Sequence, residues 1–173
     1  MKNWTILIII SSFICCQSSK QNNKKLIQLG SGFTMEVESE FKHDVKNCME
    51  SDIGVVGCYT NENRKKEIFF EIYKRRNGSN ISKTEFINNS NQFLSRIKKR
   101  HPKLKGDVFF LENINASSCV IYQLKIGDIE LNGLEANIQI GNSEINILYE
   151  STSDKKSKVE NDFTKLIHSI KPI

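Results

Sequence analysis

The sequence predicts one α+β domain in which an antiparallel β-sheet is covered by two amphipathic helices, and three observations lead to that prediction. The length of 173 residues fits a single domain better than two. Two segments repeat their apolar residues with the 3.6-residue period of a helix. Most other apolar runs alternate with a period of two, as strands with one buried face do.

The start of the chain predicts an export signal. Lys2 gives a positive charge, and the apolar run from Trp4 to Ile14 is too short for a spanning helix, which needs ~20 residues. The next segment is polar and is expected to act as a flexible tether. The predicted organisation is therefore a signal with its lipidation site at 1–16, a tether at 17–25 and one folded domain at 26–173.

Two cysteines directly after the apolar run resemble the lipobox of bacterial lipoproteins, in which such a cysteine is acylated and the signal is cut just before it. The resemblance favours Cys16 over Cys15, because Cys15 then holds the small-residue position before the cut, although Phe13 stands where the family has Leu. It implies a palmitate-type anchor that holds the domain on a membrane of the cell envelope. The absence of acidic residues just after Cys16 favours a periplasm-facing location. The alternative is an ordinary secretory signal, which would give a secreted protein.

The first half of the folded part predicts paired strands. Runs at Leu26–Gly30 and Phe33–Val37 flank a Gly-Ser-Gly turn. Farther along, Val55–Thr60 and Glu67–Lys74 are expected to form a hairpin around the polar turn at 61–64.

Two later segments predict helices. The first spans Thr84–Arg100 and starts at a capping box formed by Ser82 and Glu85. The second spans Ser153–Ile170, with Ser153 as its expected N-cap. Their apolar stripes consist of Phe86, Ile87, Phe93, Leu94 and Ile97 in the first helix, and of Val159, Phe163, Leu166, Ile167 and Ile170 in the second.

The region between these helices predicts further strands. A short run at Val108–Leu111 comes first. Alternating apolar residues over 119–150 then predict an antiparallel meander, with turns at Gly127-Asp128 and Gly141-Asn142.

The order of elements over 26–172 resembles the PsbP-like fold, shared by photosystem extrinsic proteins, a Ran-binding nuclear import factor and small DcrB-like bacterial lipoproteins. The motifs that carry the resemblance are Gly-Ser-Gly-Phe-Thr-Met-Glu-Val at 30–37 and Tyr-Glu-Ser-Thr at 149–152. Glu38-Ser39 stands where the family often has Pro. The resemblance implies a non-enzymatic scaffold for protein or ligand contact and transfers no functional residue.

Candidate chemistry is sparse, and we expect no enzyme, metal or cofactor. The three histidines are His43, His101 and His168, and none lies within a few residues of a cysteine. The Ser117-Ser118-Cys119 cluster lacks the glycines of a nucleophile elbow. Gly30-Ser31-Gly32 leads into a strand rather than a helix, so it does not predict a phosphate loop.

The remaining cysteines allow a disulfide in an oxidising compartment. Cys48 and Cys58 bracket a predicted loop and form one candidate pair. Cys58 with Cys119, across neighbouring strands, is the alternative, and Cys119 could also be a small buried apolar residue.

A dense basic cluster lies at the end of the first helix, with six fixed positive charges in ten positions. It predicts an anion-binding patch for lipid headgroups, anionic polysaccharide or an acidic protein partner. The alternative is a solvated helix end whose cations complement the helix dipole. Nucleic acid is disfavoured by export and by the lack of interleaved aromatic residues. The cluster comprises Arg96, Lys98, Lys99, Arg100, Lys103 and Lys105.

These observations favour a membrane-anchored, non-enzymatic envelope lipoprotein that acts as a protein- or ligand-binding or assembly module. One alternative is an effector-neutralising immunity protein or a chaperone. Another is a small-ligand carrier, which would need a pocket between sheet and helix lined by Phe69, Tyr73 or Tyr122.

Overall fold

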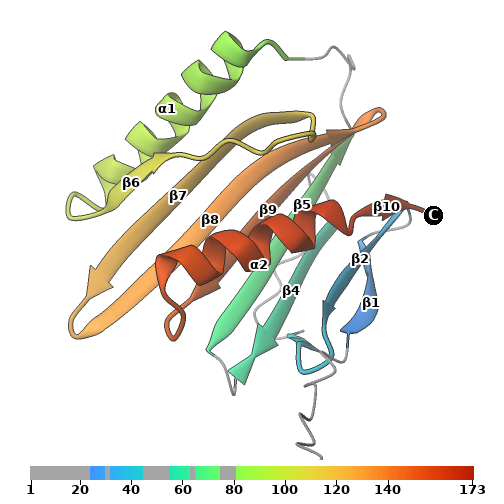
Figure 1. Cartoon of the computed structure of the whole chain (residues 1–173), viewed down its shortest axis with the longest axis horizontal. Coiled ribbons are helices and arrows are strands. Elements are labelled where there is room, and N and C mark those ends of the chain that lie inside the picture. The colour runs from blue at the N-terminus through green and yellow to red at the C-terminus, as the bar shows by residue number, and fades with distance from the viewer. Residues whose placement is uncertain (1–23, 30–31, 45–54, 63–64, 75–80) are drawn as a thin grey trace, which may run out of the picture.

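A computed structural model of the chain describes residues 24–29, 32–44, 55–62, 65–74 and 81–173. Within these ranges the chain forms a seven-stranded antiparallel sheet, a three-stranded antiparallel sheet and two helices (Figure 1). The predicted α+β class is therefore confirmed. The signal segment and residues 17–23 of the expected tether lie outside the described residues.

The large sheet contains the predicted meander, since β7 pairs with β8 and β8 with β9. Its strand order is β3 (Lys42–His43), β4 (Val55–Asn61), β5 (Lys66–Lys74), β9 (Ser143–Ser151), β8 (Ile129–Ile140), β7 (Ala116–Ile126) and β6 (Lys105–Val108).

Both turns of the meander have the predicted glycines. Gly127 has φ of +61° and Gly141 has φ of +58°. A glycine with positive φ at the first central position of a two-residue loop is what a type II′ hairpin turn requires.

The strand predicted at Val108–Leu111 is placed too late, because β6 ends where the prediction begins. Past β6 the apolar residues cover the start of the first helix instead of extending the strand. The rings of Phe110 and Phe86 lie 5.2 Å apart, and Leu111 is buried in the core.

Helix α1 (Lys83–Arg100) starts as predicted, since the Ser82 hydroxyl accepts a hydrogen bond from the Glu85 backbone N–H at 3.2 Å. Helix α2 (Lys156–His168) starts later than predicted, with Lys155 rather than Ser153 as its N-cap. The Ser151 hydroxyl accepts hydrogen bonds from the backbone N–H groups of Ser153 and Asp154. Because this turn occupies residues 151–154, the helix starts only at Lys156.

The first two strands do not join the large sheet, so the prediction of one sheet is incomplete. They form the small sheet, ordered β1 (Lys24–Leu29), β2 (Phe33–Glu38) and β10 (Lys171–Pro172). Ser169, just after α2, accepts a hydrogen bond from the Glu36 backbone N–H at 2.9 Å. The end of the chain thus fixes the small sheet, and β1 starts two residues inside the expected tether.

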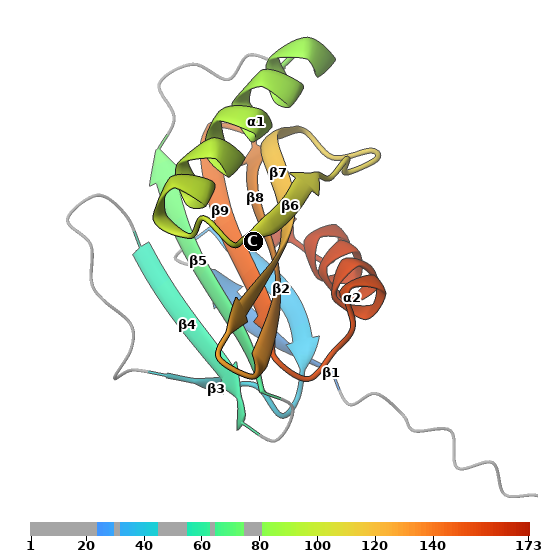
Figure 2. The ribbon, with the colours of Figure 1, turned by 90° about the vertical axis from the view of Figure 1, so that its left-hand side faces the viewer.

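The two helices cover opposite faces of the large sheet (Figure 2). Helix α2 and the small sheet bury the apolar face, whose core includes Leu134, Ile147 and Phe163. Helix α1 covers the β6–β7 part of the other face through a second cluster of Leu94, Leu104, Val120, Tyr122 and Leu124. Neither helix of the described part of the chain is long and apolar enough to cross a bilayer.

Candidate functional site

A buried lysine connects three elements of the fold. Lys66 begins β5, and its side chain has 0% exposure. Its ammonium lies 3.3 Å from Glu38 of β2, 3.1 Å from Asp154 before α2 and 3.2 Å from Asp162 within α2. We call these four residues the Lys66 junction, because they connect the large sheet, the small sheet and the helix.

The surroundings of the junction keep Lys66 and Asp162 ionised. Burial lowers the pKa of Lys66, but the Tyr149 phenol oxygen and the carboxylates of Asp154 and Glu38 raise it more, so the net shift is upward. Burial raises the pKa of Asp162, yet the ammonium groups of Lys158 and Lys66 bring it below its ordinary value. Lys66 is therefore a charged structural residue at neutral pH and not a free amine that could act as a base or nucleophile.

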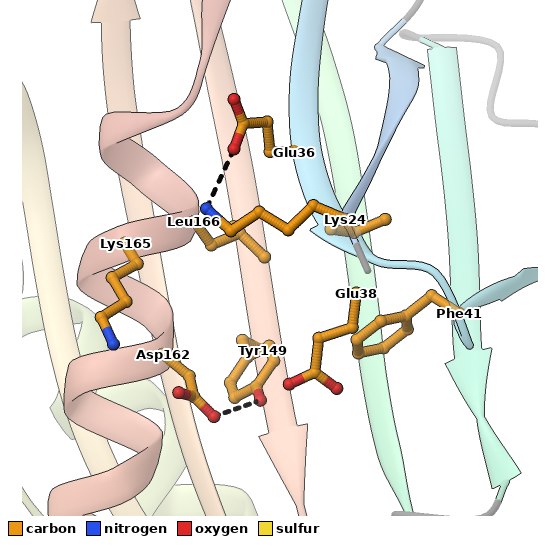
Figure 3. Close-up of a pocket in the computed structure, with 9 residues that line it drawn as sticks. Lys24, Glu36, Glu38, Phe41, Tyr149, Asp162, Lys165 and Leu166 are labelled. Atoms are coloured by element: carbon orange, nitrogen blue, oxygen red, sulfur yellow. Dashed lines mark hydrogen bonds and ion pairs between the residues drawn. The ribbon is translucent and has the colours of Figure 1, made fainter. Parts of the chain in front are cut away.

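A small cavity lies beside the junction, between the small sheet, β9 and α2 (Figure 3). The carboxylates of Glu38 and Asp162 lie on either side of the Tyr149 hydroxyl, and Lys24 pairs with Glu36 at 3.0 Å on the outer side. The volume of about 80 Å³ is far below the ~300–1,000 Å³ of typical ligand pockets. The cavity suits a few waters rather than a ligand.

A second polar surface lies on the α1 side of the large sheet. Directly paired residues share a face, and the pairings place Glu71 of β5, Glu150 of β9 and Glu135 of β8 on this one. Burial raises the pKa of Glu135 to about 7, although Asn146 donates a hydrogen bond to it at 2.9 Å. Burial also raises the pKa of Glu150, which accepts a hydrogen bond from the Tyr122 hydroxyl.

The predicted basic cluster is assembled at one corner of the fold. All six cations are exposed, and they follow one another through the end of α1, the next loop and the start of β6. None of the ion pairs between described residues involves any of them. Lys98 donates a 3.5 Å hydrogen bond to the Gly106 carbonyl.

The structure does not bring the other candidate residues into a reactive group. His43, His101 and His168 are exposed on β3, after α1 and at the end of α2. Ser117 donates a hydrogen bond to Glu144 at 3.0 Å, and Ser118 accepts one from Asn137 at 2.8 Å. No cluster of three or more His, Cys, Asp or Glu residues suited to a metal occurs within the described ranges.

Cys58 and Cys119 do not form the alternative disulfide. Cys119 is a free thiol with 0% exposure, and burial raises its pKa. Cys58 lies on β4 and Cys119 on β7, with three strands between them, which separates them by roughly 19 Å. A disulfide needs Cα atoms about 6 Å apart. The Cys48–Cys58 pair stays a prediction, because Cys48 lies outside the described residues.

At Tyr122, the pocket between sheet and helix that a ligand carrier would need is filled by the tyrosine side chain itself. This ring is 6% exposed and lies over Gly133, where an added Cβ would meet the ring carbon Cζ at 2.4 Å. The side chains of Phe69 and Tyr73 lie outside the described part of the structure.

Solved structures with a similar fold identify the architecture. Cyanobacterial PsbP from Synechocystis matches with a TM-score of 0.61 and 12% identity over 91% of this chain and 97% of that chain. The Ran-binding protein Mog1p of Saccharomyces cerevisiae matches with a TM-score of 0.56 and 10% identity over 86% and 95%. A Bacteroides thetaiotaomicron protein matches with a TM-score of 0.51 and 12% identity over 88% and 49%. No known protein family and no curated protein matches the sequence.

Proposed function

The fold is PsbP-like, and we propose that the chain is a membrane-anchored, non-enzymatic binding or assembly module of the cell envelope. A lipid on Cys16 holds it on the periplasmic side of a membrane. The basic cluster at the end of α1 then contacts an anionic surface. No nucleic acid, metal or cofactor takes part.

The observation that carries this proposal is the contrast between paired and unpaired cations among the described residues. Lys66 and Lys158 are held by carboxylates, whereas the six cations of the basic cluster are exposed and make no ion pair with a described residue. Helix-dipole complementarity accounts for cations in the last turn of α1, but not for Lys103 and Lys105 beyond it. Each cation near an anionic membrane contributes about 1 kcal/mol of attraction.

The known fold is compatible with binding but does not define the partner. Mog1p binds Ran, and a shared fold at 10% identity does not transfer that partner to this chain. The Lys66 junction supports a non-enzymatic role, because its ammonium is locked by carboxylates and its cavity is small.

The lipid anchor is tested by metabolic labelling with palmitate in a bacterium that processes the signal. Wild type and Cys15→Ser should incorporate label and float with membranes. Cys16→Ser should lose both properties. Equal labelling of all three proteins would remove the anchor from the proposal.

The basic cluster is tested by charge reversal in the full chain. Lys98→Glu, Lys99→Glu and Arg100→Glu together should lower binding to phosphatidylglycerol vesicles at least tenfold at low salt. The matched control reverses the same number of charges elsewhere, at Lys42, Lys165 and Lys171, all of which are exposed. An equal loss in both triple variants would show that only net charge matters and would contradict a localised patch.

A further inference from the structure

We propose that the tip of the β7–β8 hairpin inserts Ile126 and Ile129 into the interface of an anionic bilayer. The inference rests on the proposed function and names the second point at which the domain touches the membrane.

The two isoleucines form an exposed apolar pair at the tip. Ile126 and Ile129 have 58% and 57% exposure, and they are direct cross-strand partners on either side of the turn. Directly paired residues share a face, so both lie on the same side of the hairpin. A single exposed isoleucine is ordinary on a protein surface, but a matched pair at a tip gives a compact wedge.

The tip extends beyond its neighbouring strands. The pairing of β6 with β7 begins at Gln123, and the pairing of β9 with β8 begins at Asn132. The residues from 124 to 131 therefore pair only within the hairpin among the described strands. Figure 1 shows this hairpin reaching past the ends of β6 and β9.

The basic cluster lies close to the tip. Lys105 is paired with Gln123, three residues before Ile126, which corresponds to roughly 10 Å along the strand. Lys103 lies in the loop before β6.

Within the hairpin, the exposed Lys125 is accompanied by the exposed carboxylates of Asp128 and Glu130, so the excess positive charge near the tip comes from the adjacent basic cluster. The basic cluster has six exposed cations against the two carboxylates of the hairpin, so the apolar tip lies in a region of net positive charge. An apolar tip in such a region complements anionic headgroups over an apolar interior, which favours a bilayer over an apolar protein groove.

The anchor would hold the same side of the molecule toward the membrane. Lys24 begins β1 and pairs with Glu38, which binds Lys66. Lys66 also binds Asp154, whose carbonyl accepts a hydrogen bond from Asn132 at the base of the hairpin. Figure 1 shows both the start of β1 and the hairpin tip on the lower side of the molecule, at its right and its left. Seven residues lie between Cys16 and Lys24, so this segment can span at most about 28 Å from one Cα atom to the other.

A tryptophan placed at the tip tests insertion directly. The one Trp of the chain is Trp4, inside the predicted signal, so Ile126→Trp gives the processed protein a single tryptophan, which can be excited selectively at wavelengths too long for tyrosine. In phosphatidylglycerol vesicles with brominated acyl chains, its fluorescence should be quenched at least twofold and shifted to the blue. The matched control is Phe110→Trp, which replaces a 47% exposed aromatic residue near the start of α1 and should not be quenched.

Vesicle flotation separates this inference from the proposed function. Flotation without quenching at 126 would overturn the inserted tip and leave anchoring intact. Loss of flotation would overturn the proposed function itself. Quenching at 126 that disappears with Ile129→Ser, while flotation and melting temperature stay unchanged, would support the wedge. A blue shift produced only by added envelope proteins, and not by vesicles, would assign the tip to a protein partner and overturn the inference.

Discussion

The Tyr122 hydroxyl donates a hydrogen bond to the Glu150 carboxylate across an intervening strand. Tyr122 lies on β7 and Glu150 on β9, and both pair directly with Gly133 of β8. The aromatic ring reaches over β8 because Gly133 has no side chain. Contact across three strands thus depends on one glycine in a strand interior, a position where glycine often marks such a close approach.

Gly133→Ala should therefore destabilise the domain by about 1–3 kcal/mol. The new Cβ would lie 2.4 Å from the Tyr122 ring, which is buried and hydrogen-bonded and cannot move aside without loss. The measurement is urea denaturation followed by circular dichroism. Gly32→Ala is the matched control, because its Cβ meets nothing within 4 Å, and it should be neutral or slightly stabilising. Equal stability of both variants would contradict the packing argument.

Glu135→Gln should stabilise the protein at pH 8 by about 2 kcal/mol and have little effect near pH 4. Burial raises the pKa of Glu135 from 4.5 to about 7, with the charges of Glu150 and Glu71 adding to the rise. The folded state therefore holds a proton that the unfolded state has lost, and wild-type stability falls as pH rises from 4.5 to about 7. The glutamine keeps the oxygen that accepts the Asn146 hydrogen bond.

Thermal denaturation at pH 4, 6 and 8 checks this prediction. Glu112→Gln serves as a control at an exposed loop position and should follow the wild-type curve. A constant difference between Glu135→Gln and wild type across the three pH values would show that Glu135 does not titrate in this range.

Cys119 should resist iodoacetamide in the folded protein and react fully after denaturation. Burial raises the pKa of its thiol, and the thiolate is the reactive form. Peptide mass spectrometry without reduction measures this labelling and also tests the predicted Cys48–Cys58 bond. Rapid native alkylation of Cys119 would contradict its burial on the sheet.

Helix α2 and the last two strands of the meander were predictable from the sequence, because burial of one face sets the spacing of their apolar residues. The stripe of α2 that includes Val159 and Phe163 is buried, as its spacing implies. In β8 and β9 alternation likewise predicted which residues face the core, among them Leu134 and Ile147, whereas most of β7 is buried on both faces and Ile126 at its end is exposed. In α2, β8 and β9 one face is buried and the other is more exposed, so the spacing of apolar residues indicates both the type of element and its buried face.

The features that depend on distant partners were not predictable. Lys66 follows a polar turn and carries no local sign that Glu38 and Asp162 will enclose it. The small sheet depends on β2 pairing with residues 171–172 at the other end of the chain, which no short motif indicates. The basic cluster was visible because it is contiguous in sequence, whereas the glutamates of the sheet face come from three strands.

Lys66→Met should cost about 3–5 kcal/mol at pH 7, because it leaves three carboxylates together without their buried cation. Lys158→Met is the matched control. Lys158 contacts Asp154 and Asp162 from a position with 45% exposure, and a surface pair contributes less than about 1 kcal/mol.

The pH dependence of the Lys66→Met defect distinguishes lost charge pairing from lost packing. Pairing brings the pKa of Asp162 below its ordinary value, so its stabilising effect is present above that value and is lost as pH falls. Without Lys66 the Asp162 carboxylate should protonate more readily, and the defect should shrink between pH 7 and pH 4. Urea denaturation at both pH values measures it. A defect of equal size at the two values would mean that Lys66 stabilises the junction by filling space rather than by its charge.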